Sequence, residues 1–519
     1  MKKIIFILIS GILEILLQPS FALALPPGFG NDLRITNDPS FSGFPKLALD
    51  SSDNIHLVWQ ENRDGNAEIY YKKLDNNGGN LTLDIRLTTD PSISFYPSVS
   101  RDASGNVHVV WLDDRDLNGE IYYTKLSNTG ATIIDDLRIT TNTADSAFPS
   151  LASDSGGNLH LVWVDGRDGN AEIYYKKLDN SGASLSIDIR LTTDPAISTQ
   201  PAIAVDSNNN LHVVWTDDRD GNSEIYYKKL DNNGNNLTAD IRLTNNPADS
   251  SFPALARDPF NFIHVAWLDD RDGNPEIYYK KLDNNGAQLV ADTRLTTNIE
   301  VSWFPAISSD ASGYVQIAWT DNRDGNLEIY YTKLNNNGVT ILDDTRLTTD
   351  PAESDLPAIS ADTYSNAQIL WKDTRDLNEE IYYKRSLRPT ISLSGTPSIG
   401  GTITLNLEDR LNPNTPYLLV ASLGTAPGIP LGDGRVVPLN ADGVFYIFLF
   451  SCPFIGCVNF SGLLDANGQA TASWTIPGFA IPGINIKFAF VTVDGTLPIP
   501  QQIVSISTPV SCTLGAPSC

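Results

Sequence analysis

A tryptophan recurs every 52 residues through most of this 519-residue chain. Each copy opens a similar segment, and Trp-Thr-Asp-Asp-Arg-Asp-Gly-Asn-Ser-Glu-Ile-Tyr-Tyr at positions 215–227 is representative. A fixed period of this length is typical of solenoids and propellers, in which one supersecondary unit is copied and stacked. The repeat therefore limits the possible folds more than any other feature. Its seven tryptophans are Trp59, Trp111, Trp163, Trp215, Trp267, Trp319 and Trp371.

One period reads as four strands separated by turn residues. In the second copy, residues 97–102 are apolar at alternate positions, and residues 106–111 form a nearly continuous β-branched run. Residues 120–126 and 134–140 supply the third and fourth strands. No segment after the first 24 residues shows a helical period, and four-stranded antiparallel units that repeat around an axis are propeller blades.

The order of the strands predicts how the ring closes. The strand that contains Arg-Leu-Thr or Arg-Ile-Thr also occurs seven times, but its first copy, at Arg34, precedes the first tryptophan. The last blade ends near Leu387 without a fourth strand of its own. We therefore expect the N-terminal strand to complete the seventh blade, which removes two open sheet edges. The prediction is an all-β chain with a seven-bladed β-propeller over residues 32–387 and a C-terminal β-sandwich-like domain over residues 388–519.

The N-terminus reads as an export signal. Lys2 and Lys3 precede an apolar stretch at 4–13, and small residues at 22–24 suit signal cleavage. We expect residues 1–24 to be a signal peptide and 25–31 a short linker. The net charge of −26 and pI of about 4.4 disfavour nucleic acid and anionic lipid as partners. The expected location is periplasmic or extracellular, including the cell surface, with no membrane span in the mature chain.

The C-terminal part has few charges and several strand-like runs. These runs are 391–394, 402–407, 417–421, 443–449, 470–476 and 486–493, and their number favours a β-sandwich. All four cysteines of the chain lie here, and an even number in an exported protein predicts disulfides. Three pairings are open among Cys452, Cys457, Cys512 and Cys519.

The repeated motifs carry a resemblance. Arg-Asp-Gly-Asn-x-Glu-Ile-Tyr, Leu-Asp-x-x-Gly, Arg-Leu-Thr and a proline-led strand that ends in Asp resemble the repeats of TolB-type (PD40-like) β-propellers of exported bacterial proteins. That resemblance implies a protein-interaction platform in the cell envelope. A weaker resemblance links the chain to the sialidase superfamily, although the Ser-x-Asp-x-Gly-x-x-Trp box is not reproduced, since Asp102 lies nine residues before Trp111.

Residues that recur in every blade are expected to build blades, because one active site needs one set of groups. A histidine lies three residues before five of the tryptophans, and Gln316 and Gln368 take its place in the last two blades. His and Gln share hydrogen bonding but not acid–base chemistry, so we expect a structural bond, for example to the Asp that ends the preceding strand. A serine seventeen residues before each tryptophan is interpreted as a turn or cap hydroxyl. The histidines are His56, His108, His160, His212 and His264.

The acidic turn after each tryptophan suggests calcium, but its pattern fits a different structure better. Arg219 stands where an Asp-rich calcium loop needs an oxygen ligand. We therefore expect hairpins held by Asp–Arg and Glu–Arg pairs, no cofactor, and calcium only as an alternative. Leu117 and Leu377 replace the glycine of this turn, and the following residues, Asn118 and Asn378, are expected to take the positive φ. The representative turn residues are Asp217, Arg219, Asp220, Asn222 and Glu224.

Selectivity is expected where the blades differ. Two adjacent positions before each innermost strand vary, and the second is expected to serve mainly blade-to-blade packing. Aromatic groups there, rimmed by carboxylates, could stack on a sugar or anchor a protein loop. The predicted function is a non-catalytic binding or scaffold protein that recognises protein or glycan through the propeller face. A sialidase-like glycoside-acting enzyme and a multivalent lectin are the alternatives. The candidate binding residues are Phe95, Tyr96, Trp303, Phe304, Glu300 and Asp355.

Overall fold

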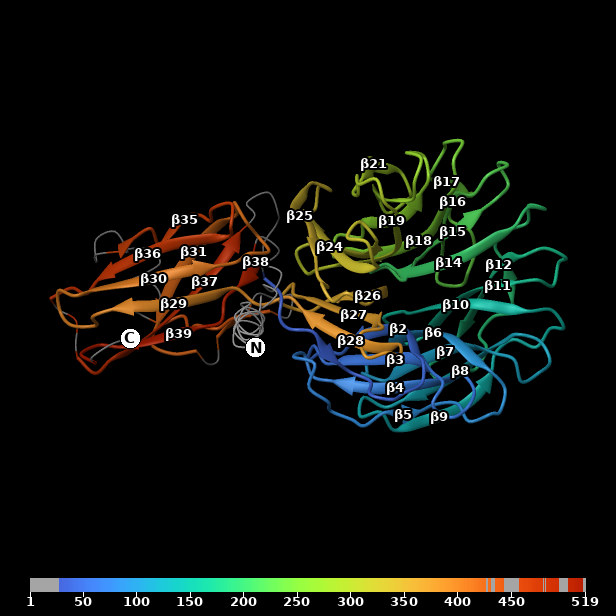
Figure 1. The fold of residues 1–519 in the computed structure, drawn as a ribbon, viewed down its shortest axis with the longest axis horizontal. Coiled ribbons are helices and arrows are strands. Elements are labelled where there is room, and N and C mark those ends of the chain that lie inside the picture. Colours follow the sequence, from blue (N-terminus) through green and yellow to red (C-terminus); the bar gives the residue numbers. More distant parts are fainter. Residues whose placement is uncertain are drawn as a thin grey trace, which may run out of the picture.

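The computed structural model describes residues 28–425, 428–430, 435–442, 457–478, 480, 482–493 and 503–516. Every regular element in these ranges is a β-strand, and none of the described residues forms a helix with the length and apolarity of a membrane span. Figure 1 shows a ring of sheets with a smaller pair of sheets beside it. The predicted signal peptide and the strand predicted at 443–449 lie outside the described residues.

Seven four-stranded antiparallel sheets form the blades of a propeller, which confirms the predicted fold class. The innermost strands contact one another in a closed cycle, from β2 through β26 and back to β2. They surround the axis of the ring (Figure 1). These strands are β2 Ser42–Leu49, β6 Ser94–Arg101, β10 Ser146–Ser153, β14 Ser198–Val205, β18 Ser250–Arg257, β22 Ser302–Ser309 and β26 Ser354–Ala361.

The second and third strands of each blade are the most buried. Their continuous apolar runs match this position, because strands covered on both faces need no alternation of polar residues. The second strands are β3 Ile55–Glu61, β7 Val107–Asp113, β11 Leu159–Asp165, β15 Leu211–Asp217, β19 Ile263–Asp269, β23 Val315–Asp321 and β27 Ala367–Asp373. The third strands are β4 Glu68–Leu74, β8 Glu120–Leu126, β12 Glu172–Leu178, β16 Glu224–Leu230, β20 Glu276–Leu282, β24 Glu328–Leu334 and β28 Glu380–Arg385.

The outermost strands vary in length from blade to blade. Three are seven residues long, whereas those of the first, third, fourth and seventh blades have two residues each. The strand predicted at 134–140 is found at Thr132–Arg138. The outermost strands are β5 Ile85–Arg86, β9 Thr132–Arg138, β13 Ile189–Arg190, β17 Ile241–Arg242, β21 Gln288–Arg294, β25 Thr340–Arg346 and β1 Leu33–Arg34.

The ring closes through β1, as predicted. Leu33 pairs with Tyr383 and Arg34 with Tyr382, so the first strand of the chain is the outermost strand of the last blade. The Arg34 side chain donates to Glu380 at 2.5 Å, the contact that Arg242 makes to Glu224 at 2.6 Å within the fourth blade. The closing strand therefore reproduces the side-chain pairing of a covalently continuous blade.

Each tryptophan packs in the interface between its own blade and the preceding one. Trp111 is fully buried and lies in one cluster with Val58, Ile69 and Tyr71 of the first blade. Burying a side chain of this size contributes several kcal/mol, and aromatic pairs add about 1 kcal/mol more. The recurring tryptophan is thus the main apolar contact that holds neighbouring blades together.

The C-terminal strands form two facing sheets with a common core. One sheet contains β29 Thr390–Gly395, β30 Thr402–Glu408, β36 Gln469–Thr475 and β34 Cys457–Val458. The other contains β35 Ser461–Leu463, β31 Pro416–Ser422, β37 Asn485–Val493, β38 Ile503–Ile506 and β39 Val510–Thr513, and a two-stranded ribbon joins β32 Ile429–Pro430 to β33 Val436–Val437. Cys457 and Cys512 each take part in a disulfide bond. Cys452 and Cys519 lie outside the described residues, so the pairing stays a prediction.

The C-terminal domain contacts the propeller through residues that depart from the repeat. Tyr314 packs with Val504, and Tyr364 packs against the core of the second C-terminal sheet. In five blades a lysine donates to an asparagine of the next blade, as Lys281 does to Asn336 at 2.8 Å. Lys333 of the sixth blade donates instead to Asn412 of the C-terminal domain at 3.2 Å. Asn412 therefore occupies the place of the missing repeat residue.

Candidate binding site

The two faces of the propeller are defined by the direction of the innermost strands. Each of these strands begins beside the acidic turn of its blade, as the backbone bond from Asn62 N to Phe41 O at 2.9 Å shows. We call this side the hairpin face. The strands end at the opposite face, where the C-terminal domain contacts the fifth to seventh blades through Phe260, Tyr314 and Tyr364. The hairpin face is the side on which sequence variation predicted a site.

At the hairpin face, every innermost strand contains a β-bulge that re-aims one side chain. The strand register shifts by one residue at this point in all seven blades, as between Gly43 and Lys46. The bulged residue has a φ between 47° and 55°, a left-handed conformation that disfavours residues other than glycine and costs about 1–2 kcal/mol per residue. We call these seven residues the collar. They are Phe44, Tyr96, Phe148, Gln200, Phe252, Phe304 and Leu356.

The collar is mostly aromatic and remains accessible to solvent. The ring of Tyr96 lies 5.2 Å from that of Phe44 and 4.9 Å from that of Phe148, and Phe252 lies 5.2 Å from Phe304. Phe148 and Phe252 nevertheless keep 42% and 39% of their surface exposed. The expectation that this position serves mainly packing between blades is therefore incomplete, because the bulge lets the rings touch across blades while one side of them faces solvent.

Gln200 interrupts the aromatic series in the fourth blade. Its Oε1 accepts hydrogen bonds from the Thr216 hydroxyl at 2.8 Å and from the Phe252 backbone N–H at 2.9 Å. The amide thus bridges two blades in place of a ring contact. This leaves the aromatic part of the collar in two arcs, one over the first three blades and one over the fifth and sixth.

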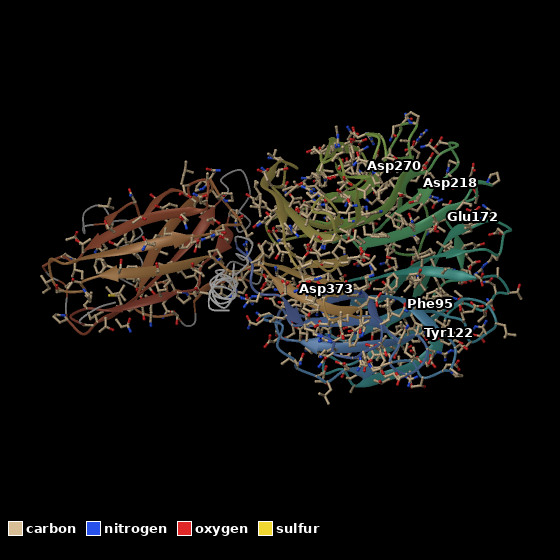
Figure 2. The ribbon with its side chains drawn as sticks, viewed as in Figure 1. Phe95, Tyr122, Glu172, Asp218, Asp270 and Asp373 are labelled. Carbon is tan, nitrogen blue, oxygen red and sulfur yellow. The ribbon has the colours of Figure 1, made fainter. Side chains whose placement is uncertain are left out.

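The predicted aromatic residues lie on the innermost strands at this mouth. Phe95 adjoins the collar, with its ring 5.0 Å from that of Tyr96 (Figure 2 labels Phe95 on the second blade). Trp303 takes the equivalent position in the sixth blade, beside Phe304, and is half-buried. These four residues contribute to one face around the axis, as the repeat alignment indicated.

The two predicted carboxylates behave differently. Glu300 is exposed in the turn before β22, where its backbone oxygen accepts from Asn274 at 2.7 Å. Asp355 accepts from Thr320 at 2.9 Å and lies 3.7 Å from the amine of Lys372. The charge of Asp355 is therefore already engaged by the protein, whereas the carboxylate of Glu300 extends into solvent.

All five recurring histidines bond a tyrosine hydroxyl, and three of them complete a buried relay to the Asp that ends the preceding strand, as expected. His108 contacts the Tyr123 hydroxyl at 2.9 Å and the carboxylate of Asp102 at 3.3 Å. Gln368 makes the same two contacts, accepting from Tyr383 at 2.5 Å and donating to Asp362 at 3.1 Å. Burial lowers the pKa of His108 to about 4, so the ring is neutral near pH 7. In the sixth blade Gln316 donates instead to the backbone oxygen of Ser365 at 3.0 Å. A position that accepts glutamine in two blades has a structural role.

The acidic turn is held together by its own charges. In the fourth blade Asp217 is fully buried and accepts from Trp215 at 2.7 Å, from Ser198 at 3.0 Å and from Arg219 at 2.7 Å. Burial opposes the ionisation of Asp217, but the bonds from Arg219 and Trp215 outweigh it and lower its pKa. The recurring serine is therefore a partner of this carboxylate rather than a turn or cap residue.

The remaining turn charges pair with the outermost strand. Arg242 donates to Glu224 at 2.6 Å and lies 3.0 Å from Asp220, and Asn222 donates to Glu224 at 3.1 Å. Within the described ranges, no group of three or more His, Cys, Asp or Glu side chains is arranged to hold a metal ion. Calcium at this turn stays a hypothesis.

The prediction about Asn118 and Asn378 was wrong. Leu117 and Leu377 themselves have φ values of 72° and 71°, close to the 90° of Gly221 in the fourth blade. Both leucines are fully exposed, so the turn geometry is imposed by the flanking charge pairs rather than by any contact of the leucine side chain. The charge pairs around the turn thus hold the backbone at a positive φ, although leucine prefers a negative φ.

Three features of the mouth were missed from the sequence. The bulge itself was not predicted, although an aromatic residue before proline in five blades was a signal, because proline disfavours right-handed helical geometry in the residue before it. The accessible rings of Phe148 and Phe252 were treated as packing residues. Lys46, just below the collar, was not singled out.

The comparisons with known proteins give a fold likeness only. No protein-family model and no curated protein matches the chain. A fungal alcohol oxidase of the AA5 family is 12% identical, with a TM-score of 0.47, and covers 94% of this chain and 100% of its own. An α-L-arabinanase from Penicillium chrysogenum is 11% identical, with a TM-score of 0.42, and covers 56% and 92%. NanB sialidase from Streptococcus pneumoniae is 11% identical, with a TM-score of 0.38, and covers 71% of each chain.

At these identities and TM-scores, no residue or activity of these proteins is transferred to this chain. The resemblance to TolB-type repeats stays an expectation.

Proposed function

We propose that this is an exported, non-catalytic protein that binds glycans at the hairpin-face mouth of the propeller. The observation that carries the proposal is the collar, in which aromatic rings are held accessible around the axis by a backbone conformation that costs energy in every blade. Strained backbone of this kind is retained when it positions side chains for a purpose. Flat apolar rings beside polar groups suit the apolar faces of sugar rings.

The non-catalytic part of the proposal rests on the state of the recurring titratable groups. The carboxylates beside the tryptophans are buried and bonded to arginine, as Asp217 is to Arg219. Four of the histidines have a pKa lowered to about 4 by burial, and His264 is shifted in the same direction. Groups that are buried and already hydrogen-bonded are poor candidates for contact with a substrate.

Export is supported by the N-terminal pattern. The expected partners are glycans, or glycan-bearing proteins, of the cell envelope or the extracellular space. A surface with a formal charge of −26 repels anionic polymers at long range, so recognition of any acidic ligand has to be local.

The test measures binding of oligosaccharides to the full-length protein by isothermal titration calorimetry. Phe252→Gly removes one exposed ring while keeping a residue that accepts the left-handed backbone, and Trp303→Ala removes the neighbouring indole. We expect each to weaken binding about tenfold, as loss of one stacking contact would do, with little change in melting temperature. Leu117→Gly is the matched control, since it makes the same kind of change at a positive-φ position of the hairpin face outside the collar. Unchanged affinity in both collar variants would contradict the proposal.

A second candidate function has one observation in its favour. Asp249 and Asp270 lie at positions that vary between blades, and burial, together with the charge of Asp249, raises the pKa of Asp270. Ser223 joins Asp249 to Asp218, since its hydroxyl donates to Asp218 at 2.6 Å and its backbone N–H donates to Asp249 at 3.0 Å. Figure 2 shows Asp218 and Asp270 on neighbouring blades. A carboxyl with a raised pKa close to a second carboxyl group is the arrangement that glycoside hydrolysis uses.

This enzyme candidate makes a distinct prediction. Turnover of a chromogenic glycoside by the wild type, lost in Asp270→Asn and retained in Trp303→Ala, would favour hydrolysis over binding alone. Absence of turnover across a panel of glycosides, with glycan binding that depends on Trp303, favours the binding protein.

A further inference from the structure

Lys46 is the only charged residue at its level of the innermost strands. It lies two residues after the collar residue Phe44, and the six equivalent residues have side chains no longer than a hydroxymethyl group. The lysine side chain therefore has room to extend from β2 toward the axis. The equivalent residues are Ser98, Ser150, Ala202, Ala254, Ala306 and Ala358.

The Lys46 side chain is accessible even though it lies in the middle of the ring. It is exposed to solvent, and because β2 belongs to the closed innermost layer, that solvent reaches it along the axis. No hydrogen bond or ion pair joins its amine to any of the described residues. The surrounding protein lowers the pKa of this amine by desolvation, with no neighbouring carboxylate to offset the effect. An anion at this point would remove that penalty.

Two other charged side chains lie on the innermost strands below the collar, and both are cationic. Arg101 donates to the backbone oxygens of Leu49 at 2.9 Å and Asp102 at 3.1 Å. Arg257 donates to the backbone oxygen of Asp258 at 3.1 Å and the side chain of Asn261 at 3.3 Å. None of these acceptors is a carboxylate, so the charges of both arginines are not neutralised by an ion pair within the described residues. Between the collar and their ends, the innermost strands thus carry three cations and no carboxylate in a strongly acidic protein.

We propose that Lys46 binds the carboxylate of a uronic acid unit whose sugar ring stacks on the collar. This inference rests on the proposed glycan function and names the class of sugar. Two residues of a strand span about 7 Å, which is comparable to the distance from the face of a sugar ring to its carboxylate and the amine that meets it. The collar then recognises the sugar ring, and the lysine recognises its negative charge.

A carboxylate fits this position better than a phosphate ester. Dianionic phosphate is typically held by several donors, such as arginine forks or clusters of backbone N–H groups. At the level of Lys46 the neighbours are alanines and serines, and the Ser98 hydroxyl already accepts from the Leu151 N–H at 3.1 Å. One ammonium group in a partly desolvated site matches a single negative charge.

The experiment titrates the full-length protein with trisaccharides of galacturonate, glucuronate and mannuronate and with their neutral hexose counterparts. Lys46→Ala restores the residue found in four other blades, so the fold is expected to tolerate it. We expect this variant to bind its preferred uronate at least tenfold more weakly and the neutral sugars within twofold of wild type. Lys487→Ala, which removes a charge from the C-terminal domain, is the control and should change neither affinity.

A relocated charge separates electrostatic recognition from an indirect effect. Ser98→Lys in the Lys46→Ala background places an amine at the same level on the next strand, and recovery of uronate binding would support a direct ion pair. Equal affinity of wild type and Lys46→Ala for uronates would overturn the inference. If Trp303→Ala still weakened all the sugars in that case, the glycan function would stand without the carboxylate site. If the wild type bound none of the sugars, the proposed function would fail together with the inference.

Discussion

The two faces of the propeller depart from the repeat for different reasons. At the hairpin face, unrepeated residues such as Phe95 and Trp303 surround an accessible collar. At the opposite face, the unrepeated aromatics Tyr314 and Tyr364 contact the C-terminal domain. Both groups look alike in an alignment of the blades. The comparison teaches that a departure from a repeat marks a contact of some kind, and only the fold shows whether the partner is another part of the same chain.

The largest effect is expected at a recurring residue. Asp217→Ala removes the acceptor for Trp215, Ser198 and Arg219 in a fully buried position. Loss of one partner from a buried charged network costs about 3–5 kcal/mol of unfolding free energy. Chemical denaturation measures this, and Asp165→Ala in the preceding blade should cost the same. A much smaller loss of unfolding free energy in either variant would contradict the interpretation that the recurring residues have a structural role.

A smaller effect is expected at the contact between the domains. Asn412→Ala leaves the buried amine of Lys333 without this acceptor, which should cost about 1–3 kcal/mol. Limited proteolysis near residue 388 should become faster. Asn284→Ala, which removes the same contact within the ring, is the control and should reduce stability without accelerating cleavage there. Equal cleavage in both variants would show that Asn412 does not hold the C-terminal domain.

Strain at the hairpin face can be measured where no binding role is proposed. Leu117→Gly and Leu377→Gly replace fully exposed leucines at φ values of 72° and 71°. Relief of left-handed strain, less the entropy of glycine in the unfolded chain, should raise the unfolding free energy by up to about 1 kcal/mol. Thermal melting compares the variants. A loss of stability would mean that the strain attributed to the turns, and by extension to the collar, is overstated.

The smallest effect at neutral pH is expected at the histidine relays. His212→Gln should change stability by less than about 1 kcal/mol at pH 7, because Gln368 makes equivalent contacts in the seventh blade. The pKa of His212 is lowered to about 4, below the usual value of about 6.5, so the folded state binds fewer protons than the unfolded state between these values. The stability that His212 contributes is therefore present above about pH 6.5 and lost as the pH falls toward about 4.

The lowered pKa of the histidines can be tested by measuring stability in acid. Stability curves from pH 7 to 4 should be flatter for a variant in which all five histidines are glutamine than for the wild type. Identical curves would show that the histidines are not neutral in the folded protein.

Much of the fold could be predicted from the sequence because the same strand and turn pattern occurs in seven copies. The number of blades, the closing strand and the histidine relays all followed from residues at fixed spacing, such as Trp111 and His108. The collar did not follow, because a positive φ arises from the pairing of two strands and not from the local sequence alone. Lys46 was not singled out although it is the only charge in its column, because the sequence alone does not show that this column lies on the innermost strands. Asn412 lies outside the repeat, and no spacing rule links it to Lys333.

The closing strand has a consequence for the order in which the molecule can mature. Arg34 is synthesised early, yet its partner Glu380 lies 346 positions later in the chain. Until the seventh blade exists, the first strand has no neighbour and the last sheet has an uncovered edge. Bringing such distant segments together is slow, so closure of the ring should be a late step in folding. Every earlier species is an open arc whose uncovered edge could pair with a strand from another molecule.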